Sequence, residues 1–114
     1  MDMELEADYL KQLFTKSQKL LVAIGDETRQ SIIIALANPE CEGMRVGEIK
    51  EKTHLSRPAV SHHLKILLDE EVVRLNRVGT KNFYSLKLGG EWQNLVKLIN
   101  SIEKVREMEG KKHG

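Results

Sequence analysis

The residues best suited to chemistry lie in one stretch of the sequence, residues 55–68. Ser56 is a good helix N-cap and Pro58 falls in the first turn, where its missing N–H costs nothing, so a helix is expected to begin here. On a helical wheel, Val60 and Leu64 begin a single buried stripe. The opposite face holds Pro58, Ser61, His62, Lys65 and Asp69, while Arg57 lies nearer the edge of the helix. Short hydrogen-bonding side chains near the start of this face, with a cation one turn later, suit a helix end inserted into the major groove of DNA. The expected DNA-binding residues of this helix are Ser56, Arg57, Pro58, Ser61, His62 and Lys65.

Individual roles on this face follow from reach and charge. Arg57 has the length for bidentate binding to guanine, or it pairs with a backbone phosphate. Ser61 is expected at a base or phosphate, and Lys65, one turn later, at a phosphate. His63 lies beside the buried stripe and is expected to pack or to bond a neighbouring carbonyl. The alternative is an ordinary solvated amphipathic helix, and the neighbouring segments decide between the two.

Other side chains with reactive or metal-binding groups do not form a recognisable site. His62 and His63 diverge by about 100° on the wheel, so in a regular helix they cannot chelate one ion together. Cys41 is the only cysteine, which excludes an internal disulfide and a multi-cysteine zinc site, and its neighbours Glu40 and Glu42 disfavour the thiolate. We therefore expect no catalytic residues, no metal and no cofactor.

The distribution of charge along the chain favours a nucleic-acid partner more strongly than the net charge of the whole chain does. The whole chain has a formal net charge of only +1. Residues 50–88, however, hold eight cations against four anions, a net +4, whereas the remainder holds ten cations against thirteen anions, a net −3. The positive charge is concentrated on the segment expected to bind DNA.

The segments before residue 56 predict a supporting set of helices. Apolar residues recur at helical spacing over 5–24, Gly25 ends that helix, and Asp26 can cap the next one. Residues 31–37 are nearly all apolar and predict a central buried helix, followed by a loop. A two-turn helix over 46–53 and a tight turn then lead into the helix that begins at Ser56, which together form a helix-turn-helix.

The segments after this helix predict a β-hairpin. Residues 72–75 and 82–88 are β-prone, and the connection between them, 76–81, contains Gly79 for the turn. A basic hairpin directly after a recognition helix is a wing, which reaches flanking phosphates or the minor groove. The wing residues expected to contact DNA are Arg77, Thr80 and Lys81.

The terminal helices predict a second subunit. The helix expected over 91–108 has an apolar face broader than one stripe, and the helix within 1–24 has the same surplus, so both are expected to pack against their counterparts in a homodimer. Residues 111–114 are expected to form a frayed polar tail. The expected dimer-interface residues are Leu5, Tyr9, Leu13, Trp92, Leu95, Leu98, Ile99 and Ile102.

Length and hydropathy set the remaining expectations. With 114 residues, the chain fits one small domain, 1–114, of mainly α-helical class with a small hairpin: a winged helix-turn-helix in the order α-α-α-α-β-β-α. No apolar run is long enough to span a membrane, and the acidic start lacks the regions of a signal peptide, so we expect a cytoplasmic protein with no membrane partner.

Three motifs resemble one known family. Residues 55–67, with the sequence Leu-Ser-Arg-Pro-Ala-Val-Ser-His-His-Leu-Lys-Ile-Leu, closely resemble the recognition helix of the ArsR/SmtB winged-helix repressors. Residues 25–29 and 83–86 resemble the family's second signature and the end of its wing. The resemblance implies a homodimeric repressor that binds an inverted-repeat operator in double-stranded DNA and leaves it when a small effector, not identifiable from the sequence, binds.

The chain departs from the family pattern in two respects. One family metal site uses a Cys-x-Cys element in the helix before the recognition helix, which residues 46–52 lack. Another uses acid and histidine pairs in the terminal helix, where Glu91 and Glu103 are the candidate acids and no histidine appears before His113. The family usually ends its recognition helix with glycine. Here Glu71 takes that left-handed position at a cost of roughly 1 kcal/mol, or the helix ends differently.

Two rival functions keep the same fold. One is a metal-responsive sensor that uses non-standard ligands such as Cys41, His54 or His113. The other is a protein-interaction module without DNA function, which has no need of the +4 segment or of the outward Ser61 and Lys65.

Overall fold

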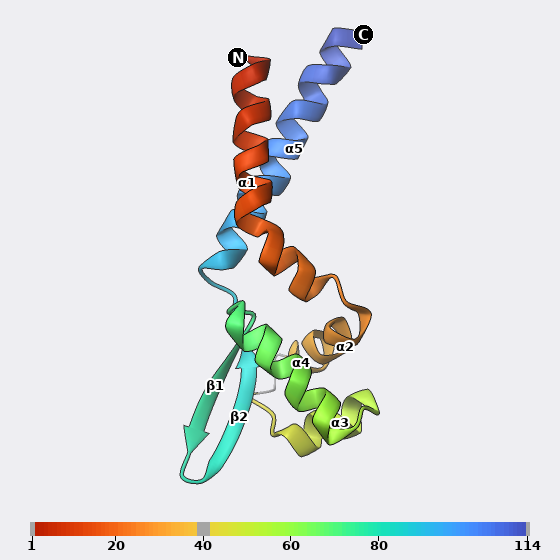
Figure 1. Ribbon diagram of the computed structural model, residues 1–114, viewed down its shortest axis with the longest axis vertical. Helices are drawn as coiled ribbons and strands as arrows, with labels where there is room; N and C mark the ends of the chain where they lie inside the picture. The colour runs from red at the N-terminus through yellow and green to blue at the C-terminus, as the bar shows by residue number, and fades with distance from the viewer. Residues whose placement is uncertain (1, 39–41, 114) are drawn as a thin grey trace. The chain divides into compact units, whose positions relative to one another are not determined.

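The computed structural model describes residues 2–38 and 42–113, the last three by their backbone alone, so Cys41 lies outside the described residues. These residues form α1 (Met3–Ile24), α2 (Glu27–Leu36), α3 (Val46–Thr53), α4 (Arg57–Asp69), β1 (Val73–Val78), β2 (Lys81–Leu86) and α5 (Glu91–His113), as Figure 1 shows. The predicted winged-helix class is confirmed. The chain divides into two compact units: residues 20–88, and residues up to 19 together with those from 89 onward.

The core of the 20–88 unit lies between α2, α3, α4 and the hairpin. Ile32, Ile49, Val60 and Leu64 are almost completely buried, which confirms the predicted inward stripe of α4. The expectation of a buried helix over 31–37 was wrong in part, because the side chain of Ile34 is 74% exposed. The sequence could not show that Ile34 is exposed, because a run of apolar residues places apolar side chains on every side of a helix, whereas the neighbouring elements cover only part of its surface.

Side-chain caps fix where two of these helices begin. Asp26 Oδ1 accepts a hydrogen bond from the Arg29 N–H at 2.9 Å at the start of α2, and Ser56 Oγ accepts one from the Ala59 N–H at 3.3 Å at the start of α4. Each bond satisfies a backbone donor that has no partner within the helix. Both caps were predicted, and the Ser56 cap fixes the first turn of the helix expected to meet DNA.

The end of α4 resolves the question raised by Glu71. Glu71 adopts a left-handed conformation with φ 57°. Its N–H donates to the Leu68 carbonyl at 3.1 Å, and the Val72 N–H donates to the Leu67 carbonyl at 2.8 Å, which is the bonding pattern of a Schellman motif. The helix therefore leaves for the wing in the usual way without the usual glycine, and Lys87 Nζ lies 2.6 Å from Glu71 Oε1.

The hairpin is longer and its turn shorter than predicted. The two strands pair from Val73 with Leu86 to Val78 with Lys81, so the connection is the two-residue turn Gly79-Thr80 and not the six residues expected. Gly79 has φ 64°, a conformation that suits such a turn. The error arose because most of β1 is exposed on both faces, which removes the alternation that marks a strand.

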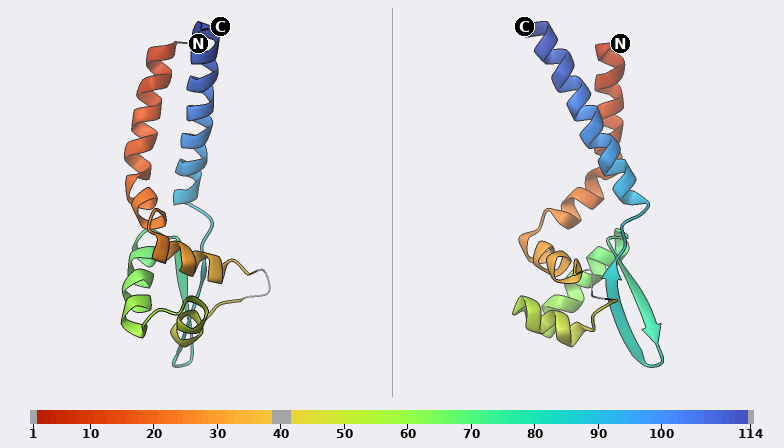
Figure 2. Two further views of the ribbon diagram at one scale, coloured as in Figure 1. Left: turned by 90° about the vertical axis from the view of Figure 1, so that its right-hand side faces the viewer. Right: turned by 180° about the vertical axis from the view of Figure 1, so that it is seen from behind.

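The other unit consists of α5 and the N-terminal part of α1, up to residue 19. The two helices run antiparallel, side by side (Figure 2). Leu13 and Leu98 are each 2% exposed within the single chain, so neither offers the dimer-interface surface expected of it. Helix α5 continues to His113, five residues beyond the predicted end, so the expectation of a frayed tail was wrong for the backbone up to that residue.

The helix pair has a polar side and an apolar side. Tyr9 lines a hollow of about 180 Å³ together with Lys97 and Lys104, which marks the polar side. Ile99 lies on the opposite side of the α5 wheel from Lys97, and Phe14 lies about 140° from Tyr9 on the α1 wheel. The apolar side carries Leu10, Phe14, Leu95, Ile99 and Ile102.

Candidate nucleic-acid interface

The outward face of α4 is open to solvent over its whole length. Its predicted DNA-binding side chains are all exposed, and none of them is covered by another part of the 20–88 unit. The buried stripe of the same helix holds this face in a fixed orientation. The exposed residues are Ser56, Arg57, Pro58, Ser61, His62 and Lys65.

The wing presents its charged residues on two different faces. Arg77 pairs across the hairpin with Asn82, whereas Lys81 pairs with Val78, and directly opposed residues share a face. Arg77 and Lys81 therefore point to opposite faces, although both are exposed. Arg77 Nε also donates to the Gly79 carbonyl at 3.2 Å, which holds its guanidinium near the tip.

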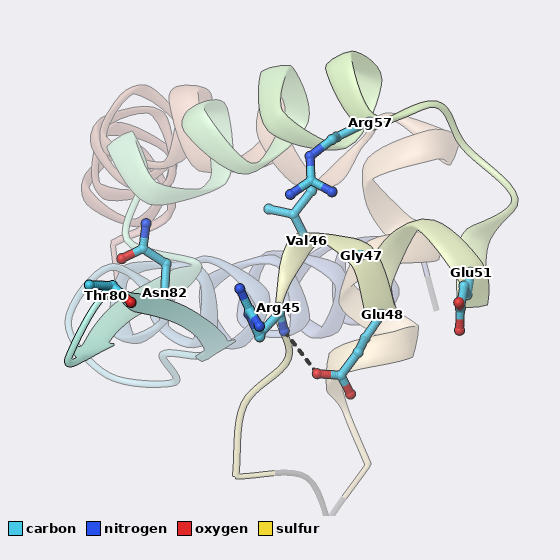
Figure 3. A pocket seen from close by; sticks show the side chains of 8 residues that line it. All are labelled: Arg45, Val46, Gly47, Glu48, Glu51, Arg57, Thr80 and Asn82. Atoms are coloured by element: carbon cyan, nitrogen blue, oxygen red, sulfur yellow. Dashed lines mark hydrogen bonds between the residues drawn. The ribbon is translucent and has the colours of Figure 1, made fainter.

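A hollow of about 640 Å³ joins the two predicted DNA-binding elements (Figure 3). Arg57 of α4 and Thr80 of the wing, which the sequence placed in separate segments, both line this hollow. It also adds Arg45, immediately before α3, and Asn82 of β2, which sequence reasoning missed. The sequence gives little indication of Arg45, because it comes against the hairpin through the pairing of Met44 with Tyr84, two residues far apart in the chain.

A buried arginine supports α4 from behind. Arg29 is 9% exposed, and its guanidinium donates to the Ala23 carbonyl at 2.7 Å and to the Val22 carbonyl at 3.2 Å. Its Nη1 also lies 3.3 Å from His63 Nδ1. This arginine links the end of α1 to the recognition helix, a role that the sequence did not reveal.

The environment of His63 lowers the pKa of its ring and so favours the neutral form. Burial lowers the pKa of His63 most, and the charges of Arg29 and His62 lower it further, while Asp26 acts in the opposite direction. A neutral Nδ1 can accept the hydrogen bond from Arg29. His63 is therefore a packing residue and not part of the outward face, as its position beside the buried stripe predicted.

Metal ligands and membrane spans were also sought in the described part of the chain. Within residues 2–38 and 42–110, whose side chains the structure describes, no three or more histidine, cysteine or acidic side chains gather as a metal ion requires. His54 is exposed at the end of α3, while Cys41 and the side chain of His113 lie outside the described residues. No helix among the described residues is long and apolar enough to cross a membrane.

Comparisons with known proteins identify the family. Residues 26–74, which span α2 to the start of β1, match the family described as "Bacterial regulatory protein, arsR family". The chain is 35% identical over 82 residues to the transcriptional repressor SdpR of Bacillus subtilis, covering 72% of this chain and 88% of the repressor. The chain belongs to the arsR family. Its relatives are transcriptional regulators and not enzymes, and the chain is a DNA-binding transcriptional regulator.

Solved structures of arsR-like regulators share the fold over most of their length. The transcriptional regulator HlyU from Vibrio vulnificus is 30% identical, with a TM-score of 0.64, and the match covers 84% of this chain and 96% of that one. A predicted DNA-binding transcriptional regulator from E. coli is 28% identical, with a TM-score of 0.64 over 86% of this chain and 97% of that one. The arsR fold therefore extends beyond the matched residues to most of the chain.

Proposed function

We propose that this arsR-family regulator is a homodimeric repressor that binds an inverted-repeat operator through α4 and the wing and is released by a small effector. The observation that carries the proposal is the outward face of α4, which is exposed, capped at Ser56 and cationic at Lys65. In a dimer, two such helices enter successive major grooves about 34–36 Å apart. Affinity then falls steeply as salt rises, because phosphate contacts release counterions.

The homodimer is supported by the surplus apolar surface of the helix pair. Ile99 and Ile102 are exposed on one side of α5, and Phe14 is exposed on the same side of the pair. A symmetric dimer buries such a patch against its own copy. Of the predicted interface residues, Tyr9 lines the polar hollow, and Leu5, four residues earlier, lies about 40° from Tyr9 on the α1 wheel and so on the same side. We therefore assign the interface to the apolar side.

A competition binding assay tests the proposed face of α4. Operator DNA is first selected from a random pool by the wild-type protein. Lys65→Ala is expected to weaken binding to operator and unrelated duplexes alike, because it removes a phosphate contact. Ser61→Ala is expected to change the order of preference among operator variants, because it removes a base contact.

The control for Lys65→Ala is Lys97→Ala, which removes an exposed lysine from α5 and is expected to bind as the wild type does. If Lys65→Ala altered sequence preference and Ser61→Ala weakened every sequence equally, the assignment of the face would be reversed. If the wild-type protein enriched no sequence from the pool, the proposed function would be wrong.

The effector is tested by release of the selected operator. Metal ions, thiol reagents and small metabolites are titrated into the complex, and loss of the bound DNA is followed. Release by a metabolite but not by ions supports the proposal in its present form. Release by soft or borderline metal ions supports a sensor with non-standard ligands instead.

A further inference from the structure

Two arginines, Arg45 and Arg57, line the hollow between α3, α4 and the wing without an ion pair to the glutamates that line it, Glu48 and Glu51. Figure 3 shows the guanidinium groups of Arg45 and Arg57 pointing into the space between these elements, with Thr80 and Asn82 on the wing side. With the side chains that the structure describes, those of residues 2–38 and 42–110, neither guanidinium makes a hydrogen bond or an ion pair. Two like charges that share a hollow repel each other unless an anion lies between them.

The carboxylates at this hollow do not neutralise the two arginines. Glu48 Oε1 accepts a hydrogen bond from the backbone N–H of Arg45 at 3.3 Å, which holds it at the base of α3. In Figure 3 the carboxylates of Glu48 and Glu51 point away from Arg57. The part of the hollow between Arg57, Arg45 and Asn82 is therefore positive and open to an incoming anion.

We propose that this hollow receives a backbone phosphate of the bound DNA, with Arg45 as its main ligand. The inference rests on the proposed function, because the phosphate belongs to the duplex that α4 enters. A guanidinium forms two parallel hydrogen bonds to a phosphate, and such contacts fix the register of a protein on DNA without reading sequence. Arg57 completes the charge, and the polar ends of Thr80 and Asn82 bond the same phosphate group from the wing. Arg45 thereby couples the depth of α4 in the groove to the position of the wing.

The test measures binding to a duplex of arbitrary sequence over a range of salt concentrations, because a phosphate contact needs no operator. Arg45→Ala is expected to weaken binding several-fold and to reduce the slope of log affinity against log salt by about 1. Arg45→Lys is expected to retain the slope while losing part of the affinity, because it keeps the charge but not the planar fork.

The matched control is Arg74→Ala. Arg74 is exposed on β1 and pairs with Ser85, on the hairpin face opposite to that of Asn82, so its loss removes the same charge away from the hollow. This variant is expected to show the wild-type slope. Arg45 is exposed as well, so both variants are expected to unfold at the wild-type temperature, which excludes misfolding as the cause of any difference.

Single neutral methylphosphonates placed along the DNA then locate the contact. At one backbone position, neutralisation is expected to weaken the wild-type complex but to have no further effect on Arg45→Ala, because the interacting pair is already lost. Equal slopes for Arg45→Ala and Arg74→Ala, or additive effects at every backbone position, would overturn the inference. Loss of affinity in Lys65→Ala without any loss in Arg45→Ala refutes the phosphate site alone, whereas a wild-type protein that does not bind DNA refutes the proposed function.

Discussion

At the scale of single residues, Glu71 shows strain that the fold tolerates. A side chain in the left-handed region costs roughly 1 kcal/mol relative to glycine. Glu71→Gly removes this strain together with the ion pair to Lys87, whereas Glu71→Ala removes the ion pair alone. We therefore expect the free energy of unfolding of Glu71→Gly to exceed that of Glu71→Ala by about 1 kcal/mol in urea denaturation. Equal values would mean that residue 71 is not left-handed in solution.

His63 gives the protein a defined response to acid. Because its pKa is lowered below the ordinary value of about 6.5, the unfolded chain takes up a proton that the folded chain resists. Its contribution to stability is complete above about pH 7 and is lost as the pH falls through 6.5 toward the folded pKa. We expect His63→Gln to lose less stability than the wild type between about pH 7.5 and 5.5, measured by denaturant unfolding. His54→Gln, at an exposed position that does not act on the pKa of His63, is the control. Parallel curves for His63→Gln and the wild type would contradict the prediction.

Residues with local partners could be predicted from sequence, and those with distant partners could not. Ser56 and Asp26 cap the N–H three residues ahead, so the chain itself brings donor and acceptor together. Arg29, by contrast, bonds the carbonyls of α1 and the ring of His63, which lies 34 residues further along. Only the packing of α1, α2 and α4 makes those partners available.

At the scale of elements, helices were predicted more accurately than the wing. Both ends of α3 and the start of α4 match the expectation, and at α4 the Ser56 cap and the proline of the first turn mark the start. The wing has little buried surface, so its sequence does not alternate clearly between apolar and polar residues. The ends of its strands could therefore not be located, and its turn was predicted too long. The hollow beside it was not predicted at all, since it depends on how close the Gly79-Thr80 turn comes to α3.

The first turn of α4 serves both stability and binding, and one position can separate the two. Aspartate caps a helix about as well as serine does, so Ser56→Asp is expected to unfold at the wild-type midpoint, whereas Ser56→Ala is expected to lose about 0.5–2 kcal/mol. The added carboxylate would meet DNA phosphates, so Ser56→Asp is expected to weaken binding several-fold at low salt and by less as salt screens the repulsion. Thermal unfolding and anisotropy titrations measure the two effects. Unchanged affinity in Ser56→Asp would place Ser56 away from the DNA.

At the scale of the whole molecule, the two sides of the helix pair define what a second copy can cover. The sequence predicted more apolar surface on both terminal helices than one chain can bury. It could not show which apolar residues lie between the two helices and which lie on the outside, because that depends on which sides of the helices face each other. In the structure Leu13 and Leu98 are buried, Tyr9 lines a hollow with Lys97 and Lys104, and Leu5 lies one turn before Tyr9 on the same side of α1. The remaining apolar side exposes Phe14, Ile99 and Ile102, and a second copy that covers them removes apolar surface from water.

This division into an apolar and a polar side predicts opposite outcomes for two equally drastic substitutions. Ile99→Glu places a charge on the apolar side, and Leu5→Glu places one on the polar side, at residues 58% and 67% exposed in the single chain. Burying an unpaired carboxylate costs about 3 kcal/mol or more, so Ile99→Glu is expected to weaken dimerisation more than about a hundredfold and to run as a single subunit in sedimentation equilibrium. Leu5→Glu is expected to remain dimeric, because its side chain stays in water. Since operator binding uses both recognition helices, Ile99→Glu is also expected to lose its preference for inverted repeats. Dissociation by Leu5→Glu but not by Ile99→Glu would move the interface to the side of Tyr9.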